Sequence, residues 1–395
     1  MHVAITRAAG AAENLEDAVW PVLDRRLLSG SPRPLAVALS GGGDSLALLL
    51  ATCGWAEQAG RALVVLTVDH GLKAESAAWT RTCAATAARL GLAFQALAWT
   101  GDKPATGVPA AARAARHALL GDAARKAGAR VILMGHTADD SLEARLMRQE
   151  GSSTSEPREW SPSPAWPQGR GLFLLRPLLA VRRAEIRGWL SARGDEWIDD
   201  PANLDAAYAR PRARQALALG AMPPAATLAH VRTAASAKAL AIACRCDEDG
   251  GFEIARAVLR DAVAGALTRF TSAACLCAAG TDRPPKRGQV ERLAARLIDS
   301  PAFVATLAGA RIEAGRVHVR FRREAGEAAR GGLASIGLRA GETAVWDGRF
   351  EVATHRNCEV RAALCATTPA GAAHAIPLTY DRLLAACGAI EREPA

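Results

Sequence analysis

The chain has 395 residues, of which half are hydrophobic but only 5% are aromatic, and it carries a formal net charge of +9. This length allows two or three domains, and the basic charge favours a nucleic-acid partner without requiring one. No run approaches the roughly 18 apolar residues that span a bilayer, and Met1–Trp20 lacks the basic and apolar segments of a secretion signal. The nine scattered cysteines favour reduced thiols. We therefore expect a cytoplasmic protein with no membrane partner.

Short apolar runs alternate with amphipathic helical patterns through the first half of the chain. Strands are expected at Leu35–Leu39, Leu63–Val68, Ala93–Ala98 and Val131–Met134. Helices are expected between them at Asp44–Cys53, Ser76–Leu90 and Pro109–Ala127. This alternation is typical of βαβ units, so the sequence predicts an α/β fold with a doubly wound, mostly parallel sheet. Ligands bind such sheets at the carboxyl ends of the strands.

The sequence pattern of the rest of the chain changes twice. Residues 151–170 are rich in Ser and Pro and predict a loop, which a strand (Leu172–Leu175) and a helix (Arg182–Arg193) follow. After a linker at 220–226, residues 227–300 have a helical, alanine-rich pattern, and from residue 311 the pattern alternates as in a strand. We expect three domains: one at 1–219, a helical domain at 220–305 and a small C-terminal α+β domain at 306–395.

The segment Ser40–Ser45, SGGGDS, lies where the first strand ends and the next helix begins. The backbone N–H groups of such a glycine-rich turn bind an anion together with the helix dipole. A Walker-type loop would end in Lys-Ser/Thr, whereas this loop has Asp44. A carboxylate beside a phosphate needs a divalent cation between them, so Asp44 is expected to bind Mg²⁺. A favourable first-turn charge is the simpler interpretation, but three glycines exceed what that requires.

Four further segments accompany the loop in chain order: VDHGLKAES (Val68–Ser76), ARAARHALL (Ala112–Leu120), GHTADDSLEARLMR (Gly135–Arg148) and DDPANLDAAYARPRAR (Asp199–Arg214). Together with the loop they resemble the tRNA(Ile)-lysidine synthetases, which are PP-loop (N-type) ATP pyrophosphatases, over about residues 30–215. The chain departs from the family pattern at four positions, where Tyr, Gln, Thr and Asn are usual: His117, Ser141, Ala144 and Pro211. The Ser/Pro segment 151–170 replaces a glycine-rich segment of that family.

The resemblance implies a two-step ligation. ATP adenylates the wobble cytidine of an isoleucine tRNA with a CAU anticodon, and free L-lysine then displaces AMP to give lysidine. ATP and Mg²⁺ are the implied cofactors, and the tRNA and L-lysine are the implied partners. The same resemblance makes the two later domains candidates for tRNA binding. The sequence is compatible with a homodimer but does not fix the oligomeric state.

The expected site residues follow from these motifs. ATP binding is expected at the loop and at the ends of neighbouring strands, namely at Ser40, Gly41, Gly42, Gly43, Asp44, Ser45, Asp69, His70 and His136. Lysine binding is expected at Asp139, Asp140 and Glu143, because carboxylates suit its amines and Asp139 and Glu143 share a helical face. The expected catalytic residues are Asp44, Asp139, Glu143 and Arg116, the last as a phosphate or adenylate contact. The arginines expected to bind tRNA are Arg210, Arg214, Arg320 and Arg322. A charged helix start and solvated surface arginines are the simpler interpretations.

Other functions stay open at this point. A related cytidine 2-thiolase would generally use C-x-x-C pairs, which this sequence lacks. A catalytically silent tRNA- or nucleotide-binding protein would not need the acids Asp44, Asp139 and Glu143, and a small-molecule amide synthetase would not need the later basic domains. The C-x-C pairs Cys244/Cys246 and Cys275/Cys277 lack the usual zinc spacing. We expect these cysteines to be small buried hydrophobes.

Overall fold

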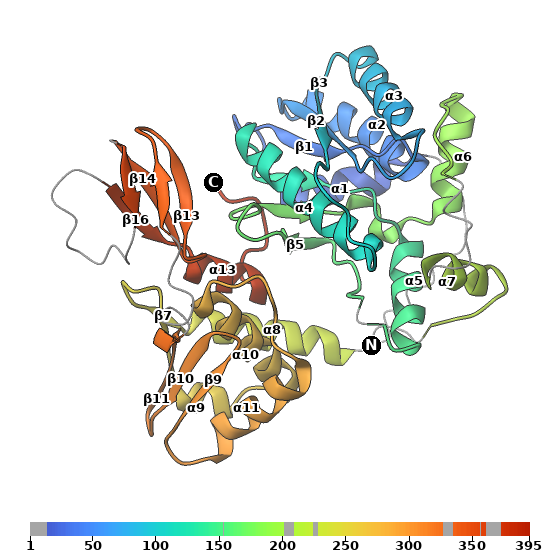
Figure 1. The fold of residues 1–395 in the computed structure, drawn as a ribbon. Coiled ribbons are helices and arrows are strands. Elements are labelled where there is room, and N and C mark those ends of the chain that lie inside the picture. The colour runs from blue at the N-terminus through green and yellow to red at the C-terminus, as the bar shows by residue number, and fades with distance from the viewer. Residues whose placement is uncertain are drawn as a thin grey trace. The chain divides into compact units, whose positions relative to one another are not determined.

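The computed structural model describes residues 14–152, 154–200, 209–223, 228–326, 335–355, 357–360 and 373–395. Residues 201–208 of the last motif and part of the expected linker therefore lie outside the described residues. The chain folds into two compact units (Figure 1). The first contains residues 1–163, 172–225 and 391–395, and the second contains residues 164–171 and 226–390. The expected subdivision of the later residues near position 305 stays a prediction.

The first unit is built on a six-stranded sheet in the order β3-β2-β1-β4-β6-β5. Its strands are β1 (Leu35–Ala38), β2 (Leu63–Asp69), β3 (Ala93–Ala98), β4 (Val131–Leu133), β5 (Trp160–Pro162) and β6 (Phe173–Leu175). Neighbours pair in parallel, except that β5 is antiparallel to β6. Its helices are α1 (Glu16–Arg26), α2 (Gly43–Gln58), α3 (Ser76–Arg89), α4 (Val108–Lys126), α5 (Ala138–Gln149), α6 (Arg183–Arg193) and α7 (Ala209–Ala218), with the 3₁₀ helix η1 at Pro177–Ala180. The expected α/β fold is confirmed.

Two hydrophobic clusters cover the two faces of this sheet. Leu35 and Val37 of β1 belong to the cluster that includes α1 and α2, whereas Ala36 belongs to the cluster that includes Leu120 of α4. This division follows from the alternation of side chains along a strand. Strand order reverses between β1 and β4, because β2 and β3 extend the sheet in one direction and β4 extends it in the other. A ligand crevice is therefore expected where β1 and β4 end.

The expectation of an unstructured loop at 151–170 is wrong at residues 160–162. Trp160–Pro162 forms strand β5, and the Trp160 ring stacks on Phe173 of β6 with centroids 4.7 Å apart. Residues 164–171 belong to the second unit, where Trp166 donates from Nε1 to the Gly348 carbonyl oxygen at 2.9 Å. The guanidinium of Arg382 lies 3.9 Å from the Trp166 ring centroid. These partners are distant in sequence, so local composition could not indicate them.

The second unit combines helices with small antiparallel sheets. Its main sheet has the order β7-β8-β11-β10-β9, from β7 (Arg245–Cys246), β8 (Phe252–Ala255), β9 (Phe303–Leu307), β10 (Ala310–Ala314) and β11 (His318–Arg323). The smaller sheets contain β12 (Ile336–Leu338) with β15 (Cys358–Val360), and β13 (Thr343–Trp346), β14 (Phe350–Thr354) and β16 (Ala373–Pro377). The helices are α8 (Leu228–Ile242), α9 (Arg256–Arg260), α10 (Ala264–Ala279), α11 (Arg287–Asp299) and α13 (Thr379–Cys387).

Among the described residues, no group of three or more His, Cys, Asp or Glu side chains is arranged to hold a metal ion. Cys275 and Cys277 are fully buried on α10, and burial raises the pKa of each thiol to about 12. Cys244 is buried as well, but Cys246 is exposed. The expectation of buried hydrophobes is thus correct for three of these four cysteines. No helix among the described residues is long and apolar enough to cross a membrane.

Candidate active site

Hydrogen bonds of Ser45 hold together the two ends of the glycine-rich loop between β1 and α2. Ser45 Oγ accepts a hydrogen bond from the Ser40 N–H at 3.1 Å and donates to the Gly42 carbonyl oxygen at 2.9 Å. Gly41 has a φ of +84°, and a Cβ there would lie 2.5 Å from Cδ1 of Ile198. Glycine satisfies both constraints. Helix α2 begins without a side-chain cap, so its first N–H groups remain suited to binding an anion.

Gly135 brings the loop after β4 against the start of α2. A Cβ at this position would lie 2.9 Å from Ser45 Cα and 3.0 Å from the Asp44 carbonyl oxygen. Both neighbours are backbone atoms that cannot rotate away, so the close approach requires glycine. The loops that follow β1 and β4 therefore lie against one another, at the place where the reversal of strand order predicts a ligand crevice.

The three acids expected to bind lysine all lie on α5, which begins just after β4. Thr137 caps this helix: its N–H and its hydroxyl donate to Asp140 Oδ2 at 2.8 and 3.0 Å. Asp140 is consequently part of the helix start as well as of the crevice. Glu143, one turn further along α5, is fully buried. A buried carboxylate needs a cationic partner.

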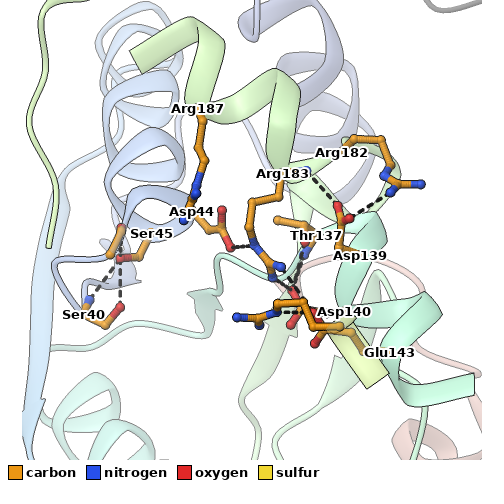
Figure 2. A network of polar contacts seen from close by, with 12 residues as sticks. Ser40, Asp44, Ser45, Thr137, Asp139, Asp140, Glu143, Arg182, Arg183 and Arg187 are labelled. Atoms are coloured by element: carbon orange, nitrogen blue, oxygen red, sulfur yellow. Dashed lines mark hydrogen bonds and ion pairs between the residues drawn. The ribbon is translucent and has the colours of Figure 1, made fainter. Parts of the chain in front are cut away.

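Arg183 is that partner, and sequence analysis did not single it out (Figure 2). Its Nε lies 3.0 Å from Asp44 Oδ2, and its Nη1 lies 3.2 Å from Glu143 Oε1. Its Nη2 lies 3.6 Å from Asp140 Oδ2, and its backbone N–H donates to Asp139 Oδ2 at 2.7 Å. One residue at the start of α6 thus joins the expected metal-binding acid to the expected lysine-binding acids.

The pKa values of Asp44 and Arg183 reflect the burial of both groups and their mutual attraction. Burial raises the pKa of Asp44 above its ordinary value, although the neighbouring Arg183 guanidinium opposes that shift. Burial also acts on Arg183, but the carboxylates of Asp44 and Asp140 outweigh it and raise the pKa of that guanidinium. Arg183 is therefore a permanent cation in the crevice.

Three further arginines contact the same acids. Arg182 Nη2 lies 3.0 Å from Asp139 Oδ1. From α7, Arg214 Nε lies 2.8 Å from Glu143 Oε1 and Arg210 Nε lies 3.4 Å from Glu143 Oε2. Two of the four arginines expected to bind tRNA thus contact an acid that is expected to bind lysine.

A second group of basic residues lies where β4 and β6 end. His136 is buried, and its Nδ1 accepts a hydrogen bond from Arg176 Nε at 3.2 Å. Burial, together with Arg176, lowers the pKa of His136 well below its ordinary value. Burial likewise lowers the pKa of His117 on α4 to about 2, with help from Arg116. Both imidazoles are therefore neutral at physiological pH.

Arg116 lies in this second group. Its Nε is buried and has no hydrogen-bond partner among the described residues. Burial lowers the pKa of its guanidinium to about 10, and Arg113 adds to that shift, but the group stays charged at neutral pH. An unpartnered buried donor on a cation is suited to an anionic ligand.

Asp69 and His70 lie at the end of β2. Asp69 Oδ1 accepts a hydrogen bond from the Gly71 N–H at 2.8 Å, so it shapes the turn after the strand. The His70 ring packs edge-on against Trp99, with centroids 6.1 Å apart, and its Nδ1 is buried without a partner in the described chain. Burial lowers the pKa of His70.

The remaining predicted site residues, Arg320 and Arg322, lie on β11 of the second unit. Both are exposed and share a strand face with His318. Arg320 pairs with Glu253, and Arg322 Nε lies 3.9 Å from Asp247 Oδ2. Surface pairs of this kind are weak, so both guanidiniums stay available to a stronger anion.

Comparisons with known proteins identify the family. A family model described as a PP-loop domain matches residues 18–219. The tRNA(Ile)-lysidine synthase of Caulobacter vibrioides is 52% identical over 336 residues, which cover 85% of this chain and 78% of the relative. The chain belongs to the tRNA(Ile)-lysidine synthase family. The resemblance seen in the motifs is confirmed, and membership of the PP-loop proteins implies the use of ATP.

Other relatives of this family extend the match beyond the first unit. The tRNA(Ile)-lysidine synthase of Hyphomonas neptunium is 35% identical over 324 residues, covering 78% of this chain and 86% of the relative. Among solved structures, the U34-tRNA thiolase NcsA from Methanococcus maripaludis with its [4Fe-4S] cluster matches with a TM-score of 0.43 and 14% identity, over 51% of this chain and 71% of that chain.

Proposed function

We propose that the protein ligates free L-lysine to the wobble cytidine of an isoleucine tRNA with a CAU anticodon, through an adenylated cytidine, with release of pyrophosphate and AMP. The names of its relatives support this reaction. At the level of residues, the main support for this reaction is the contact of Arg183 with both Asp44 and Glu143. This contact joins the loop suited to phosphate binding to the acids suited to an amine substrate.

ATP is assigned to the loop Ser40–Ser45, with Asp69, His70 and His136 at neighbouring strand ends. The free N–H groups at the start of α2 would bind the phosphates that leave as pyrophosphate. Asp44 would hold Mg²⁺, and one carboxylate is enough because this ion usually completes its shell with phosphate oxygens and water. When bound, the ion would neutralise charge that develops on the leaving pyrophosphate.

Lysine is assigned to Asp139, Asp140 and Glu143. In the second step its ε-amine attacks the activated cytidine and AMP leaves, so the amine must be held close and lose a proton. A buried carboxylate such as Glu143 binds an ammonium strongly because little water competes with it. Asp139 and Asp140 lie one turn away on the same helix and could bind the α-amine.

The cytidine and its adenylate are assigned to the basic group at Arg116. The guanidinium of Arg116 would contact the α-phosphate, where negative charge accumulates in both steps. Neutral His136 would act as a hydrogen-bonding group rather than a second cation. We assign Arg210, Arg214, Arg320 and Arg322 to the tRNA backbone.

Incubation with ATP, labelled L-lysine and bulk tRNA tests this function. We expect label in the tRNA fraction and one pyrophosphate released for each lysine incorporated. Omission of tRNA should stop both. The variant D44N should lose pyrophosphate release by at least about 100-fold, which is the usual scale for a group that stabilises developing charge. Pyrophosphate release without lysine incorporation would instead favour a different tRNA modification.

A further inference from the structure

The acids of the crevice are fully neutralised in this structure. The carboxylate cluster consists of Asp44, Asp139, Asp140 and Glu143, and every member contacts at least one guanidinium. The guanidiniums that contact the cluster belong to four residues of the described chain: Arg182, Arg183, Arg210 and Arg214. Four carboxylates thus contact four guanidiniums, of which those of Arg182 and Arg183 are labelled in Figure 2.

This balance leaves no carboxylate of the cluster without a cationic partner. Glu143 is fully buried: its Oε1 lies 2.8 and 3.2 Å from arginine nitrogens, and its Oε2, which accepts no hydrogen bond from the described residues, lies 3.4 Å from Arg210 Nε. An ammonium that joined this group unchanged would place an excess cation among four guanidiniums, and like charges at such distances repel strongly when buried. At least one arginine must therefore leave Glu143 before lysine binds there.

Arg183 is the arginine least able to leave. Its guanidinium contacts three carboxylates of the cluster, its backbone N–H is fixed on Asp139 Oδ2 at 2.7 Å, and its side chain is only 17% exposed. Arg210 and Arg214 are held less firmly. They lie one turn apart on α7, and their side chains are 39% and 33% exposed.

We propose that tRNA phosphates withdraw Arg210 and Arg214 from Glu143, and that this exchange opens Glu143 to the lysine ammonium. The inference rests on the proposed function and deepens it. Arginine binds phosphate bidentately, so a phosphodiester is a good replacement for the carboxylate that each guanidinium leaves. Every charge keeps a partner, because the phosphates neutralise the two guanidiniums and the ammonium neutralises Glu143.

The exchange makes tRNA binding a condition for tight lysine binding. By linkage, lysine must then strengthen tRNA binding by the same factor. An order of this kind would keep lysine away from the crevice until the nucleotide that accepts it is present.

Equilibrium dialysis with labelled L-lysine, without ATP, tests the exchange. For the wild-type protein we expect a tRNA(Ile) transcript with a CAU anticodon to raise lysine affinity by at least about fivefold, the lower end of typical couplings. In R210Q/R214Q, lysine affinity of the free protein should rise by a similar factor and no longer respond to the transcript. The charge-conserving R210K/R214K should restore the response. R193Q, an exposed change on α6 outside the cluster, should behave as wild type.

Two results would refute the exchange. If Arg210 and Arg214 only position Glu143, lysine affinity of free R210Q/R214Q will fall or stay unchanged, and the exchange is refuted. E143Q gives a second test that does not rely on that double variant folding. Its tRNA affinity should rise, because Arg214 loses its carboxylate partner and Arg210 keeps only Asp140, and an unchanged or lower affinity refutes the exchange. Failure of the wild-type protein to transfer lysine to tRNA would instead refute the proposed function itself.

Discussion

At the scale of single residues, the crevice depends on buried groups whose charge state is fixed by their surroundings. Arg183 lies between Asp44 and Glu143 and pairs with both side chains. His117 and His136 stay neutral because burial and nearby arginines disfavour the imidazolium. The site therefore combines paired guanidiniums and carboxylates with imidazoles that stay neutral at physiological pH.

The buried His117 predicts a loss of stability in mild acid. Its pKa is about 2 in the folded protein and about 6.5 when unfolded, so between these values only the unfolded chain takes up the proton. Its contribution is complete above pH 6.5 and falls as the pH decreases, by about 2 kcal/mol at pH 5. Urea unfolding between pH 7 and 5 should show this slope, and H117Q should show a shallower one. Equal slopes would mean that His117 gains a proton in the fold.

Prediction from the sequence was least complete for the contacts of individual residues. The acids of α5 and the glycine-rich loop were visible because their residue types and spacing are unusual. Arg183 was not, since an arginine at a helix start is ordinary and its meaning comes from three carboxylates on two other helices. The pairing of Arg210 and Arg214 with Glu143 was hidden for the same reason.

At the scale of elements, the site depends on how closely the start of α2 and the loop after β4 approach one another. Gly135 permits that approach, since a Cβ would meet backbone atoms of Asp44 and Ser45 at 3.0 and 2.9 Å. The strands and crossover helices of the first unit were predictable because apolar periodicity is local. Strand β5 was not predictable from local periodicity. It has only three residues, and the segment that separates it from its partner β6 includes residues 164–171, which belong to the other unit.

Replacement of Gly135 by alanine should damage the loop more than the fold. Overpacking of this kind costs about 1–3 kcal/mol, and here the strain falls on Asp44 and Ser45. We expect ATP affinity to drop by at least tenfold in a nucleotide-binding assay while the protein stays folded. G188A is the matched control, because Gly188 lies within α6 with open space around it and alanine favours a helix. Normal ATP affinity in G135A would show that the loop does not need this close approach.

At the scale of the whole molecule, residues at the end of the chain belong to the first unit. Glu393 and Arg61 are both fully buried, and their charged groups are paired through Oε1 and Nη2 at 2.9 Å and Oε2 and Nη1 at 2.9 Å. Arg61 also donates to the Leu28 carbonyl oxygen. The catalytic unit is thus completed by residues that follow the whole second unit in the sequence.

E393Q should therefore destabilise the first unit. Removal of one partner of a buried ion pair leaves the other charge uncompensated and costs about 3–5 kcal/mol. Thermal unfolding of the full chain measures the effect, and E391Q, at an exposed neighbouring position, should stay within about 0.5 kcal/mol of wild type. A similarly small change for E393Q would contradict the assignment of this pair as a stabilising interaction.

We propose that the exposed basic face of β11 in the second unit contacts the tRNA backbone. R320Q/R322Q should weaken tRNA binding, and the slope of log affinity against log salt should flatten by about one for each phosphate that these arginines no longer neutralise. The control is R287Q, which removes an exposed charge on α11 instead of the strand face. A salt series for all three proteins gives the comparison. If R320Q/R322Q keeps the wild-type slope, the tRNA backbone does not use this face.

The central claim is that lysine is joined to one nucleotide, and the position of the label tests it most directly. Two tRNA(Ile) transcripts that differ only at the wobble position, cytidine in one and uridine in the other, are incubated with the protein, ATP and labelled L-lysine, and then digested to nucleosides. We expect label in a single modified cytidine from the first transcript and none from the second. Label in both transcripts, or at any other position of the first, would contradict it.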